Sequence, residues 1–147
     1  MEERYTRLFS LPENLYSAGA PVMIAAGALL KDNQTGKVLA QLKLRSLVDQ
    51  KVKAVKVKIA PLDMVGKPLG ETVDHLYLDL NASRDVEFGQ KVPIPLPDAT
   101  TRGFQASVLE VVFADNTLWA AGDAPWEPLS APVPLAQALA DDELAKQ

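Results

Sequence analysis

The chain has no cysteine among its 147 residues. Disulfides, thiolate nucleophiles, zinc–thiolate sites and iron–sulfur clusters are therefore excluded together, and we expect a fold held by packing alone, with no metal or other cofactor. Positive charge is also scarce, since 15 Lys and Arg stand against 19 Asp and Glu. Without an overall positive field to gather phosphate backbones, we expect no nucleic-acid partner.

No hydrophobic run is long enough to cross a membrane. The longest, residues 18–30, is interrupted by Pro21, whereas a bilayer span needs ~20 apolar residues. This run also lies too far behind a polar amino terminus to be the core of a signal peptide. We therefore expect a cytoplasmic chain without a membrane segment.

The sequence does have a regular strand pattern. Its composition, 48% apolar and 23% charged, is that of an ordinary globular domain. Apolar and polar residues alternate with a period of two, which is typical of strands that bury one face. Seven strands are predicted, over residues 22–31, 38–45, 55–59, 75–80, 86–96, 104–113 and 118–120.

Three of these strands carry special features. The first strand is apolar on both faces, so each face must be covered by another part of the chain or by another chain. Val52 and Ala54 precede the third strand out of phase, so we expect a bulge or a late strand start there. The alternation of the sixth strand slips after Val108. Pro93 and Pro95 cannot donate ladder hydrogen bonds, which predicts an edge strand.

Frequent turns and the lack of a convincing helix between the strands favour a two-sheet fold. We predict an all-β, immunoglobulin-like β-sandwich of about seven strands over residues 22–121. Residues 1–21 are expected to form an N-terminal strap or a short helical turn. Residues 122–147 are expected to form a proline-rich arm, with a short C-terminal helix over residues 134–144.

Part of the chain resembles a known family. Residues 38–45, a polar turn and residues 55–69, which include the Asp63-Met64-Val65-Gly66 turn, resemble the bacterial immunoglobulin-like modules called FxLYD domains. The chain from Arg7 to Asn116 also resembles the leading domain of uncharacterised proteins from gut anaerobes. Both resemblances imply a sandwich fold and no particular activity.

The single histidine, His75, is not expected to be catalytic. Leu76, Leu78 and Leu80 form the apolar side of its predicted strand, so His75 should lie on the solvated side. Asp74 is its neighbour in the chain, but adjacent strand residues point to opposite faces. Asp74 therefore cannot orient His75 as the acid of a catalytic triad would.

Other candidate chemistry is equally weak. Ser83 and Ser107 lack the glycines of a nucleophile elbow. Asp85 and Glu87 share a strand face, but a sheet edge supplies no cleft between two carboxylates. The loop at residues 32–36 lacks the alternating acidic ligands and closing glutamate of a calcium loop. We expect neither an enzyme nor a metal site.

Two kinds of side chain remain as candidates for binding. Basic residues concentrate between residues 43 and 58, where Lys56 and Lys58 alternate with apolar residues. They suit either a solvated sheet face or an acidic partner. Trp119 follows the last turn and Trp126 lies between prolines. Each ring either anchors the arm to the sheet or forms part of a binding platform.

We therefore expect a non-catalytic interaction or scaffolding module. It would bind a protein partner, or a second copy of itself, through sheet edges or the doubly apolar first strand. The alternative is a module for a small ligand, such as a carbohydrate, bound on the side of Trp119 and Trp126.

Overall fold

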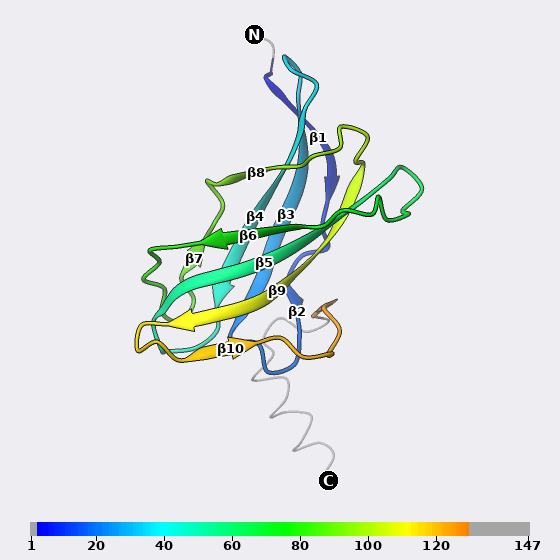
Figure 1. Cartoon of the computed structure of the whole chain (residues 1–147). Coiled ribbons are helices and arrows are strands. Elements are labelled where there is room, and N and C mark those ends of the chain that lie inside the picture. The colour runs from blue at the N-terminus through cyan, green and yellow to red at the C-terminus, as the bar shows by residue number, and fades with distance from the viewer. Residues whose placement is uncertain (1–2, 130–147) are drawn as a thin grey trace.

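The computed structural model describes residues 3–129, in which eleven β-strands and no helix are found (Figure 1). No helix within these residues therefore has the length and hydropathy of a membrane span. The strands are β1 (Tyr5–Ser10), β2 (Leu15–Tyr16), β3 (Val22–Asp32), β4 (Val38–Ser46), β5 (Val52–Leu62), β6 (Val73–Tyr77), β7 (Glu87–Phe88), β8 (Pro93–Pro95), β9 (Gly103–Phe113), β10 (Leu118–Ala120) and β11 (Glu127–Pro128).

The strands form two antiparallel sheets. One has the order β11-β2-β3-β4-β7, with β1 also paired to β3 and β8 also paired to β4. The other has the order β10-β9-β5-β6. In Figure 1 the second sheet lies in front of the first, with its strands running across those behind. The all-β prediction is confirmed for the described residues.

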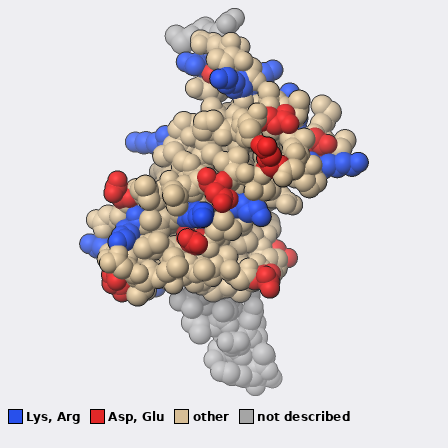
Figure 2. Space-filling model, in the orientation of Figure 1, with Lys and Arg blue, Asp and Glu red and all other residues tan. Residues whose placement is uncertain are grey.

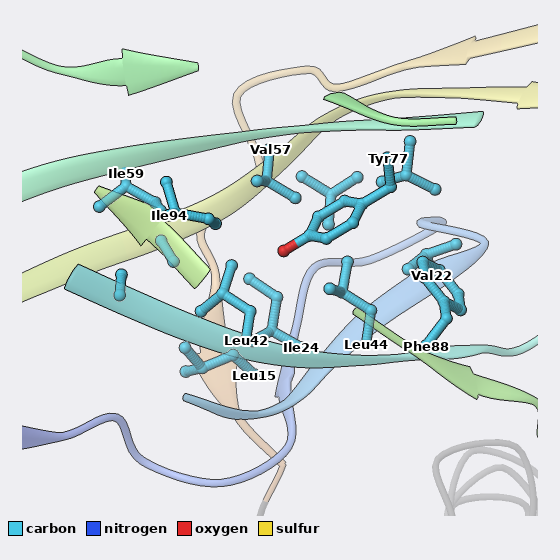
Figure 3. Close-up of a cluster of buried hydrophobic side chains, with 14 of the residues drawn as sticks. Leu15, Val22, Ile24, Leu42, Leu44, Val57, Ile59, Tyr77, Phe88 and Ile94 are labelled. Carbon is cyan, nitrogen blue, oxygen red and sulfur yellow. The ribbon is translucent and has the colours of Figure 1, made fainter. Parts of the chain in front are cut away.

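One hydrophobic core fills the space between the sheets. Alternate residues of β4 and β5 are buried, as the period of two predicts. Figure 3 shows Leu42 and Leu44 of β4 pointing toward Val57 and Ile59 of β5. All four side chains are at most 1% exposed. Burial of apolar surface between two sheets is therefore the main stabilising contribution.

The bulge expected near Val52 is present, and the phase slip of the sixth strand marks a second one. The register of β5 against β9 shifts between Val52 and Ala54 and again between Lys56 and Val57. At the second shift Leu109 is the extra residue of β9, which accounts for the phase slip after Val108. The apolar first strand, β3, is buried on both faces: among its first residues, none is more than 4% exposed from position 22 to position 25.

The proline-containing edge strand is also confirmed. β8 pairs with β4 alone, and its Pro93 and Pro95 are exposed while Ile94 between them is 1% exposed. The predicted fifth strand is however divided, since β7 and β8 pair with different parts of β4 and are separated by Gly89 with a φ of +89°. Glycine adopts this left-handed conformation without steric cost.

The predicted phase of β6 is wrong. Tyr77 faces the core and is 4% exposed, whereas Leu76 and Leu78 are 55% and 61% exposed. The register explains the inversion, because Tyr77 lies opposite Val55, whose side chain is buried. An aromatic ring here buries more apolar area than leucine does, and it reaches Phe88 at 6.2 Å between ring centroids.

The two ends of the chain also differ from expectation. The segment at residues 1–21, expected as a strap, contains β1 and β2, both of which pair with β3. An Arg4 Nη2 to Asp32 Oδ2 ion pair of 3.0 Å holds the start of β1 against the end of β3. β2 has only two residues, and β1 has no alternating burial, so neither strand shows the period of two. The helix expected over residues 134–144 lies outside the described residues.

Tyr77→Phe should leave the fold intact and stabilise it by about 1 kcal/mol. The Tyr77 hydroxyl is buried without a hydrogen-bond partner among the described residues, and Figure 3 shows it pointing into the core. Burial also raises the pKa of Tyr77. Removing an unsatisfied buried hydroxyl removes a desolvation cost of ~1–3 kcal/mol, partly offset by lost packing. Urea denaturation measures the change, and a loss of stability would show that the hydroxyl has an unseen partner.

Asp32→Asn should lower the melting temperature at neutral pH. Donation from Arg4 and from the backbone N–H of Gln34 lowers the pKa of Asp32 to about 2. A carboxylate with a lowered pKa stabilises the fold fully above its unfolded pKa and loses that effect as pH falls through the folded pKa. The difference between wild type and variant should therefore shrink between pH 4 and pH 2. Asp49→Asn, which breaks the exposed Arg84 ion pair, serves as the control.

Candidate functional site

Strand β9 is paired on both sides along only part of its length. β5 covers it from Gly103 to Phe113. On its other side, β10 pairs only with Glu110, Val111 and Val112, and the Ala121 N–H donates to the Leu109 carbonyl. Residues 103–108 have no second strand partner among the residues that the structure describes. This stretch is therefore an open sheet edge.

The edge is open because the chain leaves it. After β10 the chain crosses to the other sheet, where β11 pairs with β2 through Glu127 opposite Tyr16. The crossing segment is held by the Ser17 hydroxyl, which donates to the Ala124 carbonyl at 3.1 Å. β10 is consequently only three residues long, and within residues 3–129 no strand continues beside the first half of β9.

An apolar groove of about 590 Å³ lies beside this open edge. One wall comes from the N-terminal segment and the crossing segment, and the other from β9 and the adjoining part of β5. The first wall includes Phe9, Leu11, Pro12, Leu15, Trp126 and Pro128, and the second includes Lys58, Ala60, Phe104 and Ala106.

The walls are fixed by aromatic packing and by backbone hydrogen bonds. The rings of Phe9 and Phe104 meet edge to face, with centroids 5.4 Å apart. The Leu11 N–H donates to the Gly27 carbonyl at 2.9 Å, which places the leucine side chain over β3. A Cβ atom on Gly27 would lie 2.6 Å from Leu11 Cδ1, so a larger residue there would require the leucine side chain to shift.

Two of the four residues singled out from the sequence meet at this groove. Trp126 and Lys58 both line it. Trp119 does not, because it lies opposite Val111 and turns its ring toward the core, where it is half-buried. Lys56 is half-buried between Leu76 and Glu110, its neighbours across the sheet. The two tryptophans therefore do not form a common platform.

The basic residues between positions 43 and 58 divide between the two sheets. Lys43 and Arg45 lie on β4 and pair with Glu87 at 3.9 Å and 2.7 Å. Donation from Arg45 is the main cause that lowers the pKa of Glu87. Neither Lys56 nor Lys58 has a carboxylate within 4.0 Å among the described residues. Figure 2 shows both signs of charge interspersed on the face it presents, so this face carries no patch of one sign.

The remaining chemical candidates are accounted for by structure. His75 does not lie on the solvated side, because its strand has the inverted phase. It is half-buried, with its ring 4.7 Å from that of Tyr77, and burial lowers the pKa of His75. The Asp32 carboxylate accepts the Gln34 N–H and closes a hairpin loop. Residues 3–129 contain no cluster of three or more residues suited to hold a metal ion.

Sequence reasoning missed most of the groove. Phe9, Leu11, Phe104 and Ala106 were counted as core or strap residues because their apolar character gives no sign that a strand beside them is missing. One feature of the sequence could have indicated the open edge: the last predicted strand has only three residues before the proline-rich stretch begins. Comparisons of the chain with protein-family models, curated proteins and solved structures give no match. The groove is thus characterised by its own geometry.

Trp126→Ala should destabilise the fold by about 1–3 kcal/mol. The cost stays below the ~3–5 kcal/mol of a fully buried aromatic ring, because Trp126 is only partly buried against the core. The crossing segment should loosen first, so amide exchange at Leu129, whose N–H donates to the Asn14 carbonyl, should accelerate. Trp119→Ala is the matched control. Equal acceleration of the Leu129 amide in both variants would contradict an anchoring role for Trp126.

Proposed function

We propose that this chain is a non-catalytic protein-interaction module of the immunoglobulin-like kind. The order of its strands supports this class, since β3, β4 and β7 with β8 form one sheet while β6, β5, β9 and β10 form the other. Chains of this class divide their strands between two sheets in a similar alternation. The likeness of residues 38–69 to FxLYD modules points the same way.

The module binds an extended peptide by strand addition to β9. A peptide beside residues 103–108 gains backbone hydrogen bonds from the open edge and places every second side chain in the apolar groove. Backbone bonds supply affinity, and the groove selects for apolar residues at alternate positions. The observation that carries this proposal is that the open edge and the groove lie side by side.

The charge at the groove adds a preference. Lys58 lines the groove and has no ion-pair partner among the described residues. It lies opposite Asp74 on one side and Ser107 on the other. A peptide with a carboxylate next to its apolar residues would gain a charge-assisted contact there. Lys56 lies outside the groove and should not contribute.

A small apolar ligand is the second candidate. The groove volume of about 590 Å³ is within the ~300–1,000 Å³ of small-molecule sites. Its aromatic walls, with Phe9, Phe104 and Trp126, suit an aromatic or aliphatic molecule. Carbohydrate binding would depend on Trp126 alone, because Trp119 faces the core. A thermal-shift screen tests this candidate, since a ligand of the folded state raises the melting temperature with its concentration.

Strand addition is tested with a peptide of alternating threonine and valine. We expect it to bind the full chain and to protect the amides of residues 103–108 from hydrogen exchange. The same peptide with N-methyl groups at alternate residues should not bind, because it cannot donate to the edge. Protection at any other edge, or equal binding of both peptides, would rule out the proposed mode.

Ala106→Phe should reduce the affinity for that peptide at least tenfold. Ala106 is 8% exposed and lines the groove, so a ring in its place fills the space that the peptide side chains need. Ala120→Phe is the matched control, because Ala120 is exposed on β10 opposite Glu110 and away from the groove. Isothermal titration calorimetry measures both variants. Circular dichroism confirms that each is folded before binding is compared.

A further inference from the structure

The outer face of the β10-β9-β5-β6 sheet collects the exposed leucines. Leu76, Leu78 and Leu118 are 55%, 61% and 58% exposed, and within residues 3–129 no other leucine is exposed. All three point away from the core, because their neighbours Tyr77 and Trp119 turn inward. In Figure 1 this sheet lies in front, so Figure 2 presents its outer face, most of which is uncharged. Exposed apolar side chains gathered on one face mark an interaction site.

One row across this face holds two opposite charges. Lys56 lies opposite Leu76 on β6 and opposite Glu110 on β9, and Glu110 lies opposite Ala120 on β10. Opposite charges at neighbouring positions of this kind commonly pair. Lys56 and Glu110 are both half-buried, yet neither forms an ion pair among residues 3–129. Both charges are therefore left for a partner to satisfy.

The adjacent row is apolar from end to end. Ala54 lies opposite Val112, and Val112 lies opposite Leu118. Leu78 directly follows Tyr77, the last residue of β6, and so continues the row beyond Ala54. Leucines thus stand at both ends of this row, with smaller side chains between them.

Both rows become complementary to themselves when they are reversed. Consider a two-fold axis in the plane of an interface, parallel to the strands and midway between β5 and β9. It places β9 of a second copy over β5, and β10 of the second copy over β6. Lys56 then faces Glu110 of the second copy, and Leu78 faces Leu118 of the second copy, each contact occurring twice. The strands of the two sheets stay within about 30° of each other, which is the ordinary aligned packing of sheets.

The charges favour a second copy over an unrelated partner of one sign. Such a partner would satisfy either Lys56 or Glu110 and leave the other desolvated without a counter-charge, which is costly. A second copy satisfies both with one repeated contact. The next row, in which Asp74 lies opposite Lys58, remains at the margin and supplies the polar rim that protein interfaces have.

We propose that the chain forms a two-fold symmetric dimer through this outer face, with Lys56 paired to Glu110 of the second copy. Dimer formation does not depend on the proposed peptide site, which lies along the edge of β9 at residues 103–108. The dimer would present two such edges, so a partner that carries two suitable segments would gain avidity.

Sedimentation equilibrium of the full chain tests the dimer. We expect the average mass to rise with concentration from 15.9 kDa toward twice that value. K56E brings like charges together at both copies of the contact, so it should weaken the dimer at least tenfold, and E110K should do the same. K56E combined with E110K exchanges the two charges and should restore the affinity to within threefold of wild type. L118S should also weaken the dimer at least tenfold, because it removes the leucine contact at both ends of the apolar row.

The matched control is K37E. It changes the net charge as K56E does, but Lys37 is exposed between β3 and β4 of the other sheet, so the affinity should not change. Circular dichroism establishes that each variant is folded. A wild-type chain that stays at 15.9 kDa at every concentration would overturn the proposal. A dimer that K56E and L118S leave intact would also overturn it, since it would form through another face. Failure of K56E/E110K to regain affinity would show that the two charges do not meet across the dimer.

Discussion

The proposed binding surface of this chain depends on how β9 is paired. β5 supplies backbone bonds along all of that strand, and this pairing places the inward side chains of both strands in the shared core. On the other side, three residues of β10 are followed at once by the crossing to β2. A sheet edge left unpaired beside apolar side chains is costly, so proteins generally protect it. Here the edge is left open next to a groove.

The other edges show how this fold protects itself. Prolines in β8 remove donors from the outer side of that strand while Ile94 stays in the core. At β6 the half-buried His75 lies on the inward side, and a polar group in that position disfavours pairing with a further strand. The β9 edge has neither device within residues 103–108. This contrast sets the β9 edge apart from the other two and is what favours it as the proposed binding edge.

The sequence predicted the positions of the long strands well, because burial of one face imposes a period of two that survives in β4, β5 and β9, while β3 stands out as a run that is apolar on both faces. Bulges were visible as phase slips, and the prolines of β8 as an edge. The phase of β6 was predicted wrongly because leucine and tyrosine compete for the core, and the register with Val55 decides between them. β1, β2 and β11 were missed since long-range pairing, rather than local pattern, makes them strands.

The candidate site was predicted in part for the same reason. Trp126 and Lys58 stood out by residue type, and both line the groove. Phe9, Leu11 and Phe104 did not, because an apolar residue that lines a groove looks like one that lines a core. A groove residue differs from a core residue in the number of strands that lie beside its own strand, and this number depends on chain topology. The early end of β10 is therefore as informative about the proposed binding as any single side chain. It leaves the backbone donors and acceptors of residues 103–108 without a neighbouring strand, and it leaves space beside them for a partner.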